Sequence, residues 1–216
     1  MTKQVLYLGT HCPLPQEGEV ITHMPLIEIQ PRPFVDFPIQ ECLQEFPRFT
    51  HIIITSRNTI PILQEYLDRI GYLSLWENKI TIAVGKATER ALRESGLHHT
   101  LVAKEERAEG IITVLQEIDT RDAYFFWPHS GQARLLISDY LQSHSIHYKS
   151  CSLYDPIPKS AAEIKLDFFD EIVFTSPSVV DAFFSCHDII PSHLILRTIG
   201  PITAAYFRVC VEAIRG

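Results

Sequence analysis

Short apolar runs alternate with helical patterns along the chain, and this alternation constrains the fold more than any other feature. Each run holds four or more strand-type residues between turn or polar residues. The runs are VLYLG at 5–9, HIIIT at 51–55, ITIAVG at 80–85, TLVA at 100–103, AYFFW at 123–127, EIVFT at 171–175 and LILRTIG at 194–200. Two helical faces lie between runs, one marked by Ile60, Leu63, Leu67 and Ile70 and the other by Leu136, Ile137, Tyr140 and Leu141. Strand, helix, strand alternation predicts parallel sheets with right-handed crossovers, which is the α/β class.

The chain also repeats one strand end. Residues 49–58 read FTHIIITSRN, and residues 169–178 read FDEIVFTSPS. Three further pairs of segments resemble each other: QVLYLGT with AYFFWPH, EIQPRP with LYDPIP, and IAVGKATERAL with RTIGPITAAYF. All four pairs lie about 120 positions apart, a constant offset that indicates an internal duplication of a β/α unit.

Two proline-rich stretches, QPRP and YDPIP, mark the predicted joints between domains. Proline fixes φ and disfavours helix in the residue before it, so both stretches should be extended. We predict two small parallel-sheet α/β domains joined by a two-stranded linker, the first domain being discontinuous. The predicted boundaries are 1–30 plus 156–216 for domain 1, 34–152 for domain 2, and 30–34 and 152–158 for the linker strands.

Polar residues follow four of the predicted strands, in the motifs TSRN, VGKAT, TSPS and IGPIT. Ligands of parallel sheets collect at the carboxyl ends of strands, where helices present unpaired N–H groups and the positive ends of their dipoles. Hydroxyls and free amides in this place suit carboxylate or phosphate groups. The predicted binding residues are Thr55, Ser56, Arg57, Asn58, Gly85, Lys86, Thr88, Thr175, Ser176, Ser178, Gly200 and Thr203.

Plain helix capping is the competing interpretation of these motifs, because Ser, Thr and Asn are the preferred N-caps. The two copies also differ in charge: Arg57 and Lys86 of the first copy stand where the second has Pro177 and Pro201. Proline suits the first helical turn and offers no charge. Arg57 and Lys86, together with Arg90, therefore predict a cationic rim on domain 2 that recruits an acidic substrate; ordinary solvated surface charge is the alternative.

Composition and motifs exclude several classes of protein. With 46% hydrophobic and 21% charged residues the chain is typical of a soluble globular protein, and a net charge of −7 disfavours a nucleic-acid partner. No apolar run is long enough for a membrane span and no signal peptide is recognisable, so we expect a cytoplasmic protein. The cysteines and histidines show no metal-binding spacing. Motifs of covalent or metal-dependent catalysis, such as GxSxG and HExxH, do not occur.

The ordered motifs resemble a known family, uroporphyrinogen-III synthase. They are IIITSRNTIPIL, IAVGKATERAL, SLYDPIP, EIVFTSPSVVDAF and TIGPITAA, and they cover residues 49–207. The resemblance implies two α/β domains with the active site in the cleft between them. It also implies the reaction: hydroxymethylbilane, a linear tetrapyrrole octacarboxylate, is closed to uroporphyrinogen III with ring D inverted, without cofactor or metal. The family is typically monomeric, and a handover from the deaminase that makes the substrate is possible.

The resemblance also singles out Tyr154. It matches the family's tyrosine beside the interdomain joint, whose phenol is proposed to assist departure of the substrate hydroxyl. An amphipathic tyrosine that packs the joint is the alternative. Domain 1 departs from the family, because HCPLPQEGEV at 11–20 leaves room only for a loop where relatives have a helix. The C-terminal FRVCVEAIRG also stops before the last strand and helix of the first copy, so we expect a trimmed domain 1.

Two other functions fit parts of the pattern. Two α/β lobes with a hinge also describe non-catalytic modules that bind small anions or other ligands, although such modules usually carry a signal peptide or an output domain. A phosphate-handling transferase would use the same strand-end hydroxyls, but it should show a metal-binding acidic pair near them, and none is found.

Overall fold

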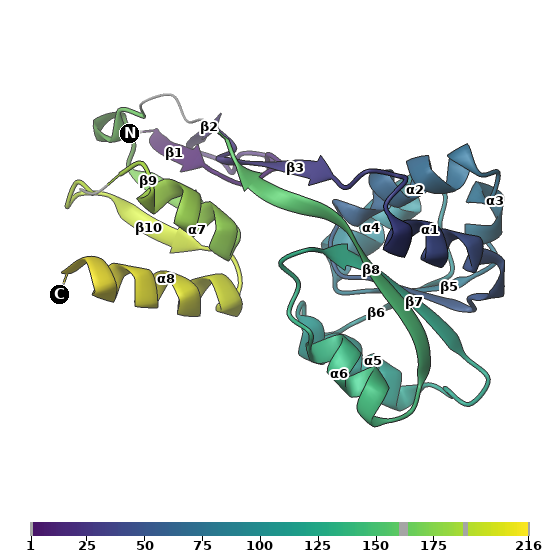
Figure 1. The fold of residues 1–216 in the computed structure, drawn as a ribbon. Coiled ribbons are helices and arrows are strands. Elements are labelled where there is room, and N and C mark those ends of the chain that lie inside the picture. The colour runs from purple at the N-terminus through teal and green to yellow at the C-terminus, as the bar shows by residue number, and fades with distance from the viewer. Residues whose placement is uncertain (1, 160–163, 188–189, 216) are drawn as a thin grey trace. The chain divides into compact units, whose positions relative to one another are not determined.

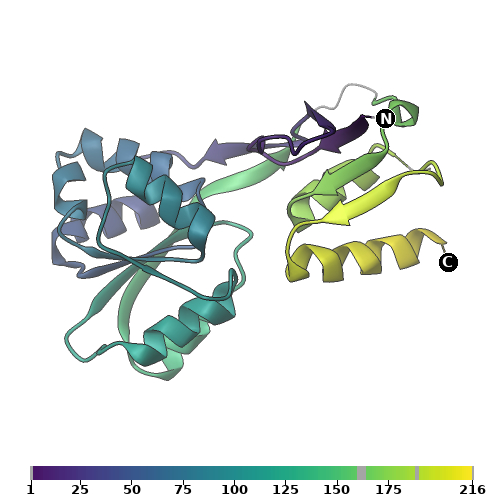
Figure 2. The same ribbon diagram turned by 180° about the vertical axis from the view of Figure 1, so that it is seen from behind.

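The computed structural model describes residues 2–159, 164–187 and 190–215 (Figures 1 and 2). The chain divides into two compact units: unit 1 is Met1–Glu28 with Pro156–Gly216, and unit 2 is Ile29–Asp155. It passes from one unit to the other in strands β3 (Ile27–Pro31) and β8 (His147–Pro158). Each unit holds a parallel sheet with helices, which confirms the predicted α/β class.

Unit 2 is built on a six-stranded sheet with the order β3-β8-β7-β4-β5-β6. Its other strands are β4 (His51–Ile54), β5 (Ile80–Ala83), β6 (Thr100–Val102) and β7 (Tyr124–Ser130). Its helices are α1 (Phe37–Gln44), η1 (Phe46–Arg48), α2 (Thr59–Arg69), α3 (Leu73–Trp76), α4 (Lys86–Glu94), α5 (Ala108–Glu117) and α6 (Leu136–Ser143). The strands from β8 to β6 pair in parallel.

Helices cover both faces of this sheet. Figure 1 shows α1 to α4 on one side of the sheet and α5 and α6 on the other. Ile52 and Ile54 of β4 belong to the core cluster that includes residues of α1 to α4, whereas Ile53 belongs to the cluster that includes residues of α5 and α6. Full burial of an isoleucine stabilises the fold by about 1.5–3 kcal/mol, so all three positions favour apolar side chains. Double coverage is thus the reason why the strand reads as a continuous apolar run.

Unit 1 holds a four-stranded sheet with the order β10-β9-β1-β2. Its strands are β1 (Lys3–Tyr7), β2 (Glu19–His23), β9 (Glu171–Phe174) and β10 (Ile195–Thr198), and its helices are η2 (Leu166–Phe168), α7 (Pro177–Phe184) and α8 (Pro201–Arg215). The larger core lies between the sheet and helices α7 and α8 (Figure 2). The smaller cluster of Val5, Tyr7, Val173 and Ile21 lies on the other face of the sheet.

The two sheets share one strand order. In unit 1 the order is β2-β1-β9-β10, and in unit 2 the corresponding strands follow as β8-β7-β4-β5. An internal duplication predicts this correspondence. The difference lies in the connections, because α6 joins β7 to β8 whereas residues 8–18, between β1 and β2, form no helix, as predicted.

Candidate functional site

The strand end of β4 places four of the predicted residues before helix α2. The Ser56 hydroxyl accepts a hydrogen bond from the backbone N–H of Asn58 at 3.2 Å, which forms the turn into the helix. Asn58 precedes the helix, but its side chain makes no capping hydrogen bond. Helix capping therefore explains Ser56 in this motif. It does not explain Thr55 and Arg57, whose side chains form no hydrogen bond or ion pair with a described residue.

Tyr154 of β8 lies at the same strand end. It is 3% exposed, and its phenol lies beside the hydroxyls of Ser56 and Thr59. Burial raises the pKa of Tyr154 above its ordinary value, and the two neighbouring hydroxyls oppose that shift. The phenol is therefore protonated at neutral pH and is available as a hydrogen-bond donor.

Thr59 is a residue of this candidate site that the sequence does not indicate. It is the first residue of α2, it is 0% exposed, and its hydroxyl lies beside the Tyr154 phenol. Buried hydroxyls in proteins are nearly always hydrogen-bonded, and the Tyr154 phenol is the neighbour with which the Thr59 hydroxyl interacts. Ser56 is partly exposed and extends this group of hydroxyls toward the surface of unit 2.

The strand end of β5 lies beside that of β4, because the two strands pair in parallel. Lys86 is the first residue of α4, and Gly85 precedes it. The backbone N–H of Lys86 donates to Glu106 Oε1 at 3.1 Å, a contact with the loop after β6 that the sequence did not reveal. Thr88 is buried in the first turn of α4.

Three cations stand at these two strand ends. Arg57, Lys86 and Arg90 are exposed, and none of them forms an ion pair with a described residue. By contrast, the guanidinium of Arg134 is held by the carboxylate of Glu109 at 3.1 Å. The side chains of the predicted rim residues are thus not engaged by a carboxylate among the described residues.

In unit 1 the strand end of β9 is organised by hydrogen bonds. The Ser176 hydroxyl accepts from the backbone N–H of Val179 at 3.4 Å and lies 3.0 Å from the Ser178 hydroxyl. Ser176 is therefore an N-cap of α7, as the capping interpretation predicts. Thr175 packs against Gly9, where a Cβ atom would lie 2.5 Å from Thr175 Cγ2.

The strand end of β10 leads into α8. Gly200 has a φ of +78°, a left-handed conformation that glycine adopts readily. Pro201 is the first residue of α8, just as Pro177 is the first residue of α7, which confirms their predicted positions. Thr203 is buried in the first turn of α8. The motifs of β9 and β10 lie side by side, because these strands pair in parallel.

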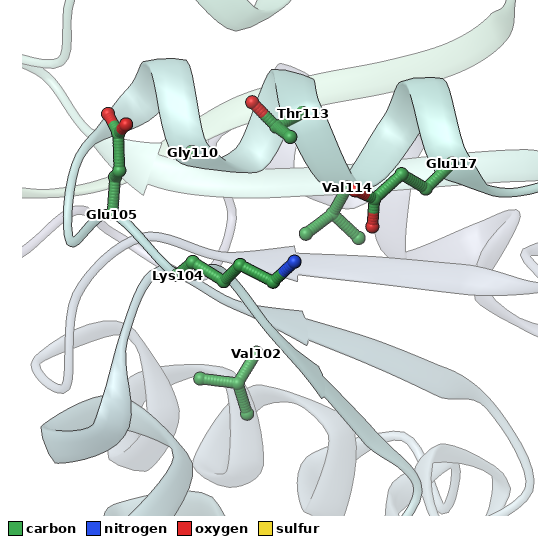
Figure 3. A pocket seen from close by; sticks show the side chains of 7 residues that line it. All are labelled: Val102, Lys104, Glu105, Gly110, Thr113, Val114 and Glu117. Carbon is green, nitrogen blue, oxygen red and sulfur yellow. The ribbon is translucent and has the colours of Figure 1, made fainter.

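A small cavity of about 120 Å³ opens between β6 and α5 (Figure 3). Val102 and Val114 form its apolar part, and Lys104 and Glu117 lie along it. It contains none of the predicted site residues. Among the described residues no group of three or more His, Cys, Asp and Glu side chains is arranged to hold a metal ion. Within the same ranges, no helix has the length and apolar character to cross a bilayer.

Fold and site define a class: a parallel α/β protein of two units, with hydroxyls and helix N-termini at the strand ends of both. A comparison with protein families matches residues 10–210 to the family described as Uroporphyrinogen-III synthase HemD. The chain belongs to the uroporphyrinogen-III synthase family. Accordingly, it is an enzyme of tetrapyrrole biosynthesis that cyclises hydroxymethylbilane to uroporphyrinogen III with inversion of ring D, and not the alternative binding module.

Solved structures of such enzymes share this fold. The uroporphyrinogen-III synthetase from Helicobacter pylori is 19% identical with a TM-score of 0.66, over 97% of this chain and 89% of that chain. A mutant uroporphyrinogen III synthase from Thermus thermophilus is 14% identical with a TM-score of 0.61, over 96% and 88%. The wild-type enzyme from the same bacterium is 16% identical with a TM-score of 0.54, over 96% and 88%. A search of curated proteins finds no match.

Proposed function

We propose that carboxylates of hydroxymethylbilane bind at the polar strand ends of both units, and that unit 2 supplies the positive charge. The observation that carries this proposal is a set of three cations near two helix N-termini, Arg57, Lys86 and Arg90, which form no ion pair with the residues that the structure describes. Each exposed pair of opposite charges contributes about 0.2–1 kcal/mol. Several such pairs together bind a substrate with many carboxylates because, once one carboxylate is held, the others bind intramolecularly.

The strand ends of unit 1 are proposed to contribute hydrogen bonds instead of charge. Ser178 and Thr175 are partly exposed, whereas Pro177 and Pro201 leave the first turns of α7 and α8 without cations. Hydroxyls and backbone amides at these positions suit carboxylate oxygens. This division of roles follows from the difference between the two copies of the repeat.

Tyr154 is proposed to assist loss of the substrate hydroxyl. The hydroxyl leaves as water, which requires one proton, and the pyrrole N–H proton that is lost when the azafulvene forms balances it. With a pKa raised by burial, the phenol donates a hydrogen bond to the departing oxygen and keeps most of its proton. The partly exposed Ser56 hydroxyl lies beside the phenol on the side of the surface and is proposed to orient it toward the substrate.

Ring D inversion is then a matter of positioning. The substituted carbon of ring D must attack the azafulvene, giving a spiro intermediate that fragments and recloses, before the unsubstituted carbon closes the ring as isomer I. Holding the reacting atoms in one geometry supplies on the order of several kcal/mol without any covalent role for a side chain. Carboxylates fixed at several strand ends provide that restraint.

Product binding tests the site independently of turnover. Uroporphyrinogen III kept reduced under anaerobic conditions should raise the Tm of the wild-type chain, because a ligand that binds the native state stabilises it. The double variant Arg57→Ala with Lys86→Ala should lose most of that shift. Arg121→Ala removes a positive charge just before β7, at the amino-terminal ends of the strands and away from the candidate site, and should keep the Tm shift. Equal shifts in both variants would refute the placement of the cationic rim.

Three finer expectations belong to this proposal. We propose that the enzyme acts as a cytoplasmic monomer and that it receives hydroxymethylbilane soon after the deaminase releases it. The reason for early transfer is chemical, since free hydroxymethylbilane closes spontaneously to the wrong isomer. Light scattering of the purified chain during size-exclusion chromatography tests the oligomeric state, and a dimer mass at micromolar concentration would contradict it.

A further inference from the structure

A carboxylate of the chain itself occupies the helix N-terminus at the strand end of β5. Glu106 lies in the loop between β6 and α5, and its Oε1 accepts a hydrogen bond from the backbone N–H of Lys86 at 3.1 Å. Glu106 is exposed and forms no ion pair with a described residue. The contact with this amide is thus what holds its carboxylate among the described residues.

Gly85 gives that carboxylate its room. A Cβ atom on Gly85 would lie 2.5 Å from Glu106 Cγ and 2.6 Å from both Cδ and Oε1. The φ of Gly85 is 176°, which any residue adopts, so the backbone conformation does not require glycine here. What the glycine provides is a space above the first amide of α4 that fits a carboxylate.

The other helix starts differ from this one. Among the described helices, α4 is the one whose first amide is bound by a carboxylate from a distant segment, whereas α7 is capped by the neutral hydroxyl of Ser176. The side chain of Lys86 and those of Arg57 and Arg90 stay free of ion pairs in the described part of the chain. Glu89, in the first turn of α4, pairs with Arg93, so Glu106 is the carboxylate that lies beside these three cations without an ion pair among the described residues.

We propose that Glu106 is an internal substitute for a substrate carboxylate and sets the affinity of the enzyme for its substrate. Glu106 must leave the amide of Lys86 before a carboxylate of hydroxymethylbilane binds there, so the two carboxylates compete. This inference rests on the proposed function, because it assumes that the strand end of β5 binds substrate. The observed affinity is then the intrinsic affinity multiplied by the fraction of enzyme in which Glu106 has left the amide of Lys86.

Competition predicts that removing the Glu106 carboxylate lowers KM, whereas loss of a helix cap alone would not lower it. Glu106→Gln keeps the shape and a hydrogen-bond acceptor but loses the charge, and Glu106→Ala empties the space above Gly85. The KM for hydroxymethylbilane generated in situ should fall by about threefold to tenfold in Glu106→Ala, with Glu106→Gln in between. The value of kcat should change by less than twofold, because Glu106 has no contact with Tyr154. Loss of the cap alone would instead lower the Tm and leave KM unchanged or raised.

Two control variants separate the possible outcomes. Glu94→Ala removes the same charge from the exposed last residue of α4, and it should leave KM unchanged if the effect is local. Lys86→Ala tests the proposed function itself, and it should raise KM. If KM rises in Lys86→Ala but does not fall in Glu106→Ala, the proposed role of Glu106 is overturned and the proposed function stands. An unchanged KM in both variants would overturn the binding of substrate at this strand end as well, and an equal fall in Glu94→Ala would overturn local competition.

Discussion

Replacing Tyr154 with phenylalanine tests the proposed chemistry most sharply, because it removes one oxygen and keeps the ring. The ring is packed in the core beneath α2, where Tyr154 is 3% exposed, so phenylalanine fits the same space. Loss of a neutral hydroxyl from such a place costs about 1 kcal/mol of stability. The fold should therefore survive, and the change in rate should report on catalysis.

The expected fall in kcat of Tyr154→Phe follows from the acidity of the Tyr154 phenol. Burial raises the pKa of Tyr154, so the phenol is a weaker acid than free tyrosine, whose pKa is about 10. A dedicated general acid contributes about 10²-fold to 10⁴-fold. A hydrogen bond that strengthens as the hydroxyl leaves should contribute less, so we expect kcat to fall by about 10-fold to 100-fold, or about 1.4–2.7 kcal/mol of barrier. The wild-type rate should also not fall between pH 7 and pH 9 through deprotonation of Tyr154, because the raised pKa keeps the phenol protonated.

Tyr66→Phe provides a matched control. Tyr66 is also 3% exposed in the same core, and its hydroxyl donates to the backbone carbonyl of Arg32 instead of lying beside Ser56. Both variants should lose similar stability in urea unfolding, and only Tyr154→Phe should lose kcat in a coupled assay at saturating hydroxymethylbilane. A kcat within twofold of wild type in Tyr154→Phe would refute the role of the phenol, and a fall well beyond about 100-fold would show that the phenol contributes as much as a dedicated general acid.

Three further predictions concern the rim, the sheet of unit 1 and the joint. Arg57→Ala with Lys86→Ala should raise KM by about tenfold, because two exposed charges of up to about 1 kcal/mol each are lost; steady-state kinetics would disprove this with an unchanged KM. Burial acts to raise the pKa of Glu171, but hydrogen bonds from Lys3 and Arg197 lower it overall. The ionised Glu171 carboxylate therefore stabilises the fold above its unfolded-state pKa, and this stabilisation is lost as pH falls through its folded-state pKa. Glu171→Gln should cost about 1–2 kcal/mol of stability at pH 7 and should make stability depend less on pH in the acid range. A stability–pH curve that runs parallel to that of the wild type would contradict this. Gly131→Ala places a Cβ atom on the carboxylate of Asp155 and should lower stability by about 1–3 kcal/mol in urea unfolding, whereas an unchanged midpoint would show that the carboxylate moves aside easily.

The sequence predicts this fold well where strands are covered on both faces. Runs such as HIIIT leave no alternative to a buried strand, and helix starts at Pro177 and Pro201 follow from the fixed φ of proline. Strand β2 is not predicted, and only the ends of β3 and β8 are predicted, as linker strands, because most side chains of these three strands are partly exposed and polar residues interrupt them. Their pairing depends on neighbouring strands far away in the chain, which local patterns do not record.

The candidate site shows the same limit. The strand-end motifs are predicted as binding residues because hydroxyls and glycine stand together after an apolar run, and this remains a prediction. Glu106 was missed, because nothing in KEERAEG distinguishes it from Glu105; only the path of the loop brings it to the amide of Lys86. The burial of Thr59 beside Tyr154 likewise depends on the pairing of β7 with both β8 and β4, which brings together two residues that are distant in the chain.

The central claim is that this chain directs ring closure with ring D inverted. The most direct measurement generates hydroxymethylbilane in situ with the deaminase, adds the purified chain, oxidises the products and separates the porphyrin isomers. The account predicts uroporphyrin III as the main product with the intact chain and uroporphyrin I with the heat-denatured chain. Isomer I alone in the presence of the intact chain would contradict it.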